Sequence, residues 1–239
     1  MLSATVGPRR FTPGASPFKE AAHSMIGLKI EVETPIEMVG NGIMRLFVLC
    51  SLAVMLASTQ GLASAFGFKA GMTKDQIVAI VGTKALTEVK GDMYTFSTAP
   101  TPHPEFEEYL CIISPKEGLM KVVAISKDIE TNRFGDAVKE RFAQIQAGVS
   151  KTYGKGDSYD LLQDGSMWND PQDWMMGLLK KDRELVTYWK LSTPQDHITI
   201  VALEAKALSM EKGYLKLVYE FEGWEQYVDK KKERQDTVF

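Results

Sequence analysis

The residues whose types and spacing come closest to a catalytic or metal site lie in His103-Pro-Glu105-Phe-Glu107, where an imidazole and two carboxylates are neighbours. Such groups can hold a metal ion or exchange protons with a substrate. Their spacing matches no established zinc motif, and the prolines of 99–105 favour an extended surface loop. We therefore expect a solvated loop here. A hydrolase or metal enzyme around His103 and Glu105 is the least favoured of three functional hypotheses.

Three other segments resemble reactive sites only in part. Ser166 lacks the second glycine of a nucleophile elbow. Gly154-Lys-Gly-Asp-Ser158 follows an expected helix, whereas a phosphate-binding loop follows a strand. Cys111 lies in an apolar run with no histidine beside it, so we expect a buried, inert thiol. The sequence thus predicts no catalytic residue, no cofactor and no metal, and leaves enzymatic activity uncertain.

Three tryptophans suggest a second hypothesis. Trp168 and Trp174 enclose an unusual polar string, and Trp189 follows in an apolar segment. In a periplasmic small-ligand binding protein, these rings would line a pocket for an apolar or sugar ligand between helix 171–182 and the sheet. The alternative is that Trp168 and Trp174 enclose the helix start as a hydrophobic staple.

The cellular location is indicated by a leader-like segment. Met44-Arg45 is followed by an apolar run over 46–57 and by Gly61-Leu-Ala-Ser-Ala65, the order of a secretory signal peptide with its Ala-x-Ala site. We expect residues 1–43 to be a disordered upstream extension, 44–65 a signal peptide cut after Ala65, and the protein to be periplasmic. The apolar run is shorter than the ~20 residues of a spanning helix. We therefore expect no stable membrane span after cleavage, with retention as an anchor the alternative.

The charge of the remaining chain argues against one class of partner. Removal of residues 1–65 takes five basic and four acidic residues from the 28 and 31 of the whole chain, which leaves a net charge of about -4. No basic stripe is present that would neutralise a row of phosphates, so we expect no nucleic-acid binding.

The region 66–130 predicts one helix followed by four strands. Thr73 and Gln76 form a capping box, and Gly82 is placed to end the helix. Apolar segments separated by turn residues, such as Gly91-Asp92 and Pro115 to Gly118, predict strands at 86–90, 93–98, 106–114 and 119–127.

The region 131–239 predicts the same order of elements. A helical stripe that ends at Gly154 contains Phe134, Val138, Phe142, Ile145, Val149 and Tyr153. A polar loop over 154–167 precedes a helix over 171–182 that starts at Asp170-Pro171. Strands are expected at 184–191, 198–208 and 214–221, and a charged tail helix at 222–239.

This pattern predicts an α+β fold in which short helices pack on one side of one or two antiparallel meander sheets. The mature domain would span 66–239, with halves 66–130 and 131–239.

The segment 68–82, with Gly71-Met-Thr73 before an apolar helix and Gly82 after it, resembles one family. This family includes the small lipoprotein of the outer-membrane barrel-assembly machinery and the secreted β-lactamase inhibitor proteins. The resemblance implies a secreted, non-catalytic helix-plus-sheet binding module.

The alternation of side chains in the last three strands defines a mixed face opposite the expected core. It contains Val186, Tyr188, Lys190, Ile198, Ile200, Ala202, Glu204, Lys206, Tyr214, Lys216, Val218 and Glu220. Apolar patches with aromatic anchors and charged rims are typical of protein-binding surfaces. The favoured hypothesis is therefore a non-catalytic module that binds another bacterial envelope protein through Val186, Tyr188, Ile198, Ile200, Tyr214 and Val218. The alternative is that the first-half sheet or the tail helix covers this face.

Overall fold

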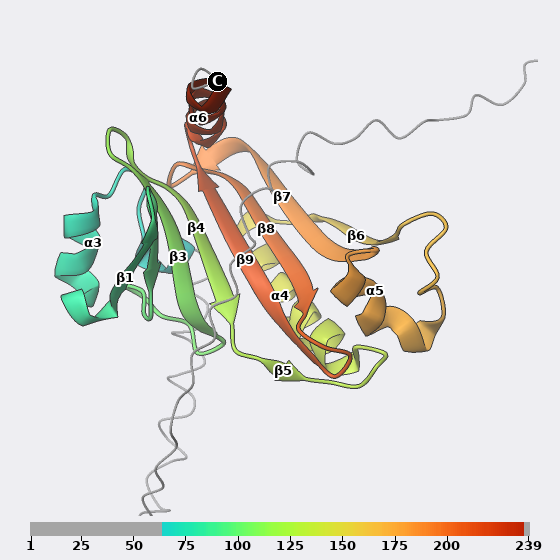
Figure 1. Ribbon diagram of the computed structural model, residues 1–239. Coiled ribbons are helices and arrows are strands. Elements are labelled where there is room, and N and C mark those ends of the chain that lie inside the picture. The colour runs from blue at the N-terminus through green and yellow to red at the C-terminus, as the bar shows by residue number, and fades with distance from the viewer. Residues whose placement is uncertain (1–63, 237–239) are drawn as a thin grey trace, which may run out of the picture. The chain divides into compact units, whose positions relative to one another are not determined.

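The computed structural model describes residues 64–236, which belong to the second of two compact units, Arg45–Phe239. The predicted upstream extension and all but the last two residues of the predicted signal peptide lie outside the described residues. The described part of the chain contains four α-helices and one nine-stranded antiparallel sheet (Figure 1). The α+β class predicted from the sequence is therefore confirmed, and the sheet dominates the fold.

Strands from both halves of the chain form this single sheet. The strand order is β1-β2-β3-β4-β9-β8-β7-β6, and the short β5 pairs with β9. The strands are β1 Leu86–Lys90, β2 Met93–Phe96, β3 Phe106–Ser114, β4 Gly118–Ser126, β5 Ile129–Glu130, β6 Asp157–Leu162, β7 Arg183–Gln195, β8 Ile198–Ala207 and β9 Lys212–Phe221. The halves join where β4 pairs with β9, with Val122 opposite Tyr219.

The helices lie near their predicted positions. They are α3 Lys74–Val81, α4 Asp136–Tyr153, α5 Trp174–Lys180 and α6 Trp224–Asp236, with short 3-10 turns at Ala65–Gly67, Thr83–Ala85 and Pro171–Asp173. However, α5 starts at Trp174 and not at Pro171, and the predicted cap residue Asp170 makes no side-chain cap. The predicted capping box is confirmed, because the Gln76 N–H donates to the Thr73 hydroxyl and the Gln76 side chain accepts from the Thr73 N–H. Before α3, Gly71 donates to the Leu119 carbonyl at 3.0 Å, which attaches the segment to β4.

Two further predicted boundaries were wrong. Phe134 precedes α4 and is 45% exposed, because Gly135 interrupts the helical stripe with a positive φ of 74°. A Cβ at Gly135 would stand 2.2 Å from the Trp174 ring, so the close approach of α5 requires glycine there. The predicted polar loop 154–167 contains the edge strand β6, whose side chains are almost all exposed and show no apolar alternation.

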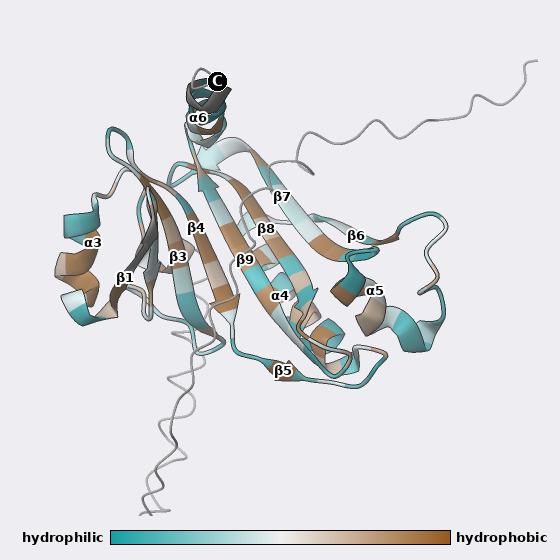
Figure 2. Cartoon of the chain, viewed as in Figure 1, coloured by the Kyte–Doolittle hydropathy of each residue, from teal (hydrophilic) through white to brown (hydrophobic). Residues whose placement is uncertain are grey.

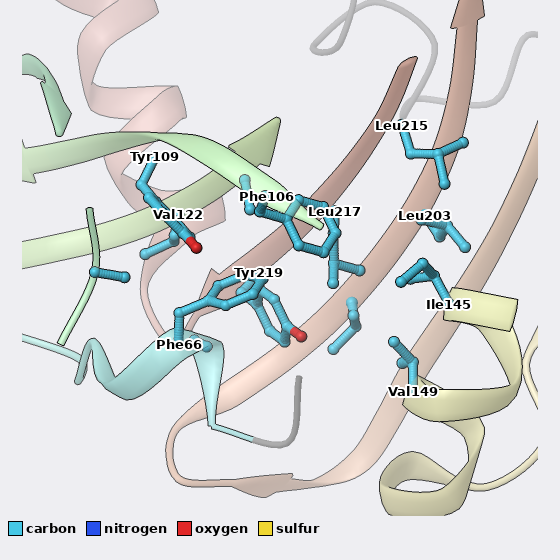
Figure 3. Close-up of a cluster of buried hydrophobic side chains, with 14 of the residues drawn as sticks. Phe66, Phe106, Tyr109, Val122, Ile145, Val149, Leu203, Leu215, Leu217 and Tyr219 are labelled. Atoms are coloured by element: carbon cyan, nitrogen blue, oxygen red, sulfur yellow. The ribbon is translucent and has the colours of Figure 1, made fainter. Parts of the chain in front are cut away.

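One hydrophobic core lies between the inner face of the sheet and helices α3, α4 and α5. In it, α4 packs against inner-face side chains of β8 and β9, as drawn in Figure 3. Figure 2 shows hydrophobic residues gathered along the middle of β8 and β9, and both faces of these strands carry buried residues. The α4 side chains of this core are Val138, Phe142, Ile145 and Val149.

Phe66 is a central core residue that sequence reasoning missed. Its ring lies 5.0 Å from Tyr109, 5.1 Å from Phe106 and 5.8 Å from Tyr219, each in an edge-on arrangement (Figure 3). Ala65 and Phe66 are both 0% exposed. The folded core therefore includes residues on both sides of the predicted cleavage site.

We expect Phe66→Ala to lower the free energy of unfolding by about 3–5 kcal/mol, because it leaves a cavity among three aromatic rings. The control Phe134→Ala removes a 45% exposed ring and should cost about 0.5 kcal/mol or less. Urea unfolding of both variants measures the difference. Equal losses would contradict the central position of Phe66.

Candidate binding face

The outer face of the sheet, the side opposite the core contacts of α3, α4 and α5, carries an apolar row across five strands. Its members are direct cross-strand neighbours in turn, on β7, β8, β9, β4 and β3: Tyr188, Ala202, Val218, Val123 and Leu110. Ala202, Val218 and Val123 form a buried cluster, with Tyr188 and Leu110 packed against it. This row exists only because β4 adjoins β9, so both halves of the chain contribute to the face.

A charged row lies beside the apolar row on one side. Glu204 accepts hydrogen bonds from Lys206 at 2.9 Å and from Lys216 at 3.2 Å, and Lys216 is only 5% exposed. Burial alone would raise the pKa of Glu204, but the two ammonium groups lower it to about 2. Burial lowers the pKa of Lys216, and Glu204 opposes that shift. The three groups thus form a charge network that depends on the central carboxylate.

A second charged row lies on the other side. Lys121 on β4 donates to Glu220 on β9 at 2.8 Å, and its ammonium stands 4.7 Å from the centroid of the Trp224 ring in α6. Next to this pair, Trp224 packs with Ile112 and Met120. The tail helix α6 therefore covers part of the outer face, over β3 and β4. Coverage by this helix was one of the alternatives considered from the sequence. The first-half strands continue the sheet and do not cover it.

Aromatic side chains lie along the β6 and β7 side of the face. Tyr159 on the edge strand is 44% exposed, and its ring centroid lies 6.5 Å from that of Tyr188. Burial and nearby carboxylates, Glu204 first, raise the pKa of Tyr188 to about 12, so its hydroxyl stays protonated and can donate a hydrogen bond. Tyr159 was missed because β6 carries no strand signal in the sequence.

The structure places most of the predicted partner-binding residues on this face. Val186, Ile200 and Val218 are buried there, while Tyr188 and Tyr214 are partly exposed. Ile198 was wrongly predicted: it is 1% exposed and belongs to the inner core. A register shift between Ile198 and Ile200 places Ile198 opposite the inner residue Phe221, which breaks the simple alternation.

The predicted tryptophan-lined pocket finds little support in the positions of the rings. Trp174 and Trp189 are 3% and 2% exposed and belong to the core. Their indole N–H groups donate to Asp160 at 3.3 Å and to the Gly154 carbonyl at 3.0 Å, so their polar atoms are already used by the fold. Trp168 is partly exposed on the loop before α5.

The loop with His103 is packed, which corrects the expectation of a solvated loop. His103 is 7% exposed, its ring lies edge-on to Phe106 at 5.7 Å, and its Nδ1 accepts from the Glu105 N–H at 3.2 Å. Glu105 forms an ion pair with Arg141 of α4.

Within residues 64–236, no group of three or more His, Cys, Asp or Glu side chains is arranged to hold a metal ion. Cys111 is buried, and burial raises the pKa of its thiol.

Comparisons with known proteins do not extend this description. No protein-family model, no curated protein and no solved structure matches the chain. Separately, the helices within residues 64–236 include none with the length and apolar character needed to cross a membrane.

We expect Glu204→Gln to destabilise the protein by about 3 kcal/mol, because it leaves the buried Lys216 without its counter-charge. The double variant Glu204→Gln with Lys216→Met should recover most of that loss. The wild-type advantage should also disappear as pH falls from about 5 to about 2, since the folded pKa of Glu204 lies below its unfolded value. Urea unfolding measures both effects, and equal losses in the single and double variants would contradict the proposed network.

We also expect His103→Asn to change the pH dependence of stability. Burial lowers the pKa of His103, although Glu105 opposes the shift, so the unfolded chain takes up a proton more readily than the folded protein. Wild-type stability should therefore fall as pH drops below about 6.5. Asparagine can still accept from the Glu105 N–H but does not titrate. Unfolding free energies at pH 7.5 and pH 5 should differ less in the variant; identical differences would exclude this role for His103.

Proposed function

We propose that this protein is an exported, non-catalytic interaction module of the bacterial envelope that binds another envelope protein through the outer face of its sheet. The observation that carries the proposal is the pair of solvent-accessible tyrosines of the outer face: Tyr159 and Tyr188 lie beside a buried apolar row that is bordered on both sides by charged pairs. An apolar centre with a polar rim is the usual anatomy of protein interfaces.

The packing on the inner side of the sheet also supports the outer face as the binding surface. Helices α3, α4 and α5 pack on one side and fill it with core side chains, so recognition is left to the other side. Figure 1 shows α4 behind β8 and β9, while these two strands face the viewer. The uncovered part of the outer face then lies towards β6 and β7, away from the contacts of α6 with β3 and β4.

The charges of the outer face favour a protein partner. Lys206, Lys216 and Lys121 alternate with Glu204 and Glu220, so the face has neither a strong positive field for phosphates nor a uniform apolar surface for lipid tails. A protein can match such a pattern with its own charges of both signs. Tyr159 and Tyr188 supply the rigid aromatic anchors that dominate binding energy in many interfaces.

Export rests on the order of charged, apolar and small residues over 44–65. Cys111 is the single cysteine downstream of residue 65, so the domain needs no disulfide to fold in an oxidising compartment. The proposed location is therefore the periplasm, where an envelope partner is accessible.

The test is recovery of a partner from a periplasmic extract with the full chain as bait. We expect Tyr159→Ser to reduce recovery at least tenfold, which corresponds to about 1.4 kcal/mol of binding energy. The control Phe134→Ser removes an equally exposed ring, 45% against 44%, from the loop before α4. It should leave recovery unchanged.

Thermal unfolding separates loss of binding from loss of folding. The melting temperatures of both variants should stay within a few degrees of wild type, because each ring is about half exposed. A partner recovered equally well by wild type and Tyr159→Ser, with Tyr188→Ser also without effect, would contradict binding through this face.

A further inference from the structure

The segment Ser64–Phe68 is built into the domain as part of its fold. The Gly67 N–H donates to the Ser64 carbonyl at 2.9 Å, and the Phe68 N–H donates to the Ala65 carbonyl at 3.1 Å. The Phe66 carbonyl accepts from the Thr101 N–H at 2.8 Å. Ser64 and Ala65 therefore supply acceptors to the turn that carries Phe66 into the core.

The backbone of this turn is held in an unfavourable conformation. Ala65 and Phe66 have positive φ values of 46° and 60°, which non-glycine residues rarely adopt. Such conformations persist only where the surroundings determine them. Here the determining contacts are the three aromatic neighbours of Phe66 and the close approach of Gly67 to Thr101.

A cut after Ala65 conflicts with this arrangement. It would remove the fully buried Ala65, both carbonyl acceptors of the turn, and the burial that they provide. It would also place a new α-ammonium group on Phe66, whose side chain is 0% exposed. Burial of a charged group without a partner is strongly unfavourable.

We propose that the leader is removed after Ala63, so that the mature protein begins at Ser64. Gly61-Leu62-Ala63 satisfies the same requirement for small residues at the first and third positions before the cut as Ala63-Ser64-Ala65 does. A cut after Ala63 keeps Ser64, Ala65 and the three backbone hydrogen bonds of the turn. The new ammonium then lies on Ser64, outside the aromatic cluster of the core. This inference rests on the proposed export of the protein.

The experiment is to express the full chain in a Gram-negative bacterium, recover the protein from the periplasm and determine its N-terminal sequence. The expected sequence is Ser64-Ala-Phe-Gly67. A product that begins at Phe66 would overturn the inference and leave export intact. A chain that stays uncut in the cytosol would instead remove the proposed export, and the inference with it.

Two matched leader variants separate the alternative cuts. Gly61→Gln puts a large side chain at the third position before a cut after Ala63, but at the fifth position before a cut after Ala65. We expect it to reduce the product that begins at Ser64 at least tenfold, with the remaining chain left as precursor or cut after Ala65, as N-terminal sequencing and an immunoblot would show. Leu62→Gln makes the same chemical change at a position that neither cut restricts, and should be processed like wild type. A Gly61→Gln product that still begins at Ser64 in the wild-type amount would overturn the cut after Ala63.

Discussion

The pairing of β4 with β9 is the interaction on which the rest of this structure depends. Five residue pairs, from Lys121 opposite Glu220 to Ile125 opposite Lys216, join the strands of the first half, β1–β5, to those of the second half, β6–β9. The seam makes one sheet from two, so a single core forms beneath it. It also aligns Val123 with Val218 on the outer face, which turns two separate strand faces into one continuous row.

The outer face contains a nearly buried charge network, which a simple solvated sheet would not contain. Lys216 is nearly buried, and its desolvation is offset only by the Glu204 carboxylate that it shares with Lys206. Such arrangements add little stability compared with apolar residues of similar size. In the proposed interface, fixed charges beside the apolar row would favour one partner and disfavour others.

Local sequence signals predicted the elements of this fold well, because caps and turns act over a few residues. Thr73, Gln76, Gly82 and Gly154 delimit α3 and α4 as expected. Long-range pairing carries no such local signal, so the β4–β9 seam and the contribution of Val123 to the candidate face were not predictable. The position of Ile198 was missed because a bulge shifts the alternation, and β6 was missed because an exposed edge strand needs no apolar pattern.

The central claim is that the outer face, and not the helical side, contacts a partner in the envelope. Site-specific photocrosslinking in living cells tests this most directly, with the probe placed at Lys190 on the outer face of β7 or at Gln144 on α4, both exposed positions. The account predicts a discrete crosslinked envelope protein from position 190 and none from position 144. Crosslinking from position 144 alone, or from neither position, would contradict it.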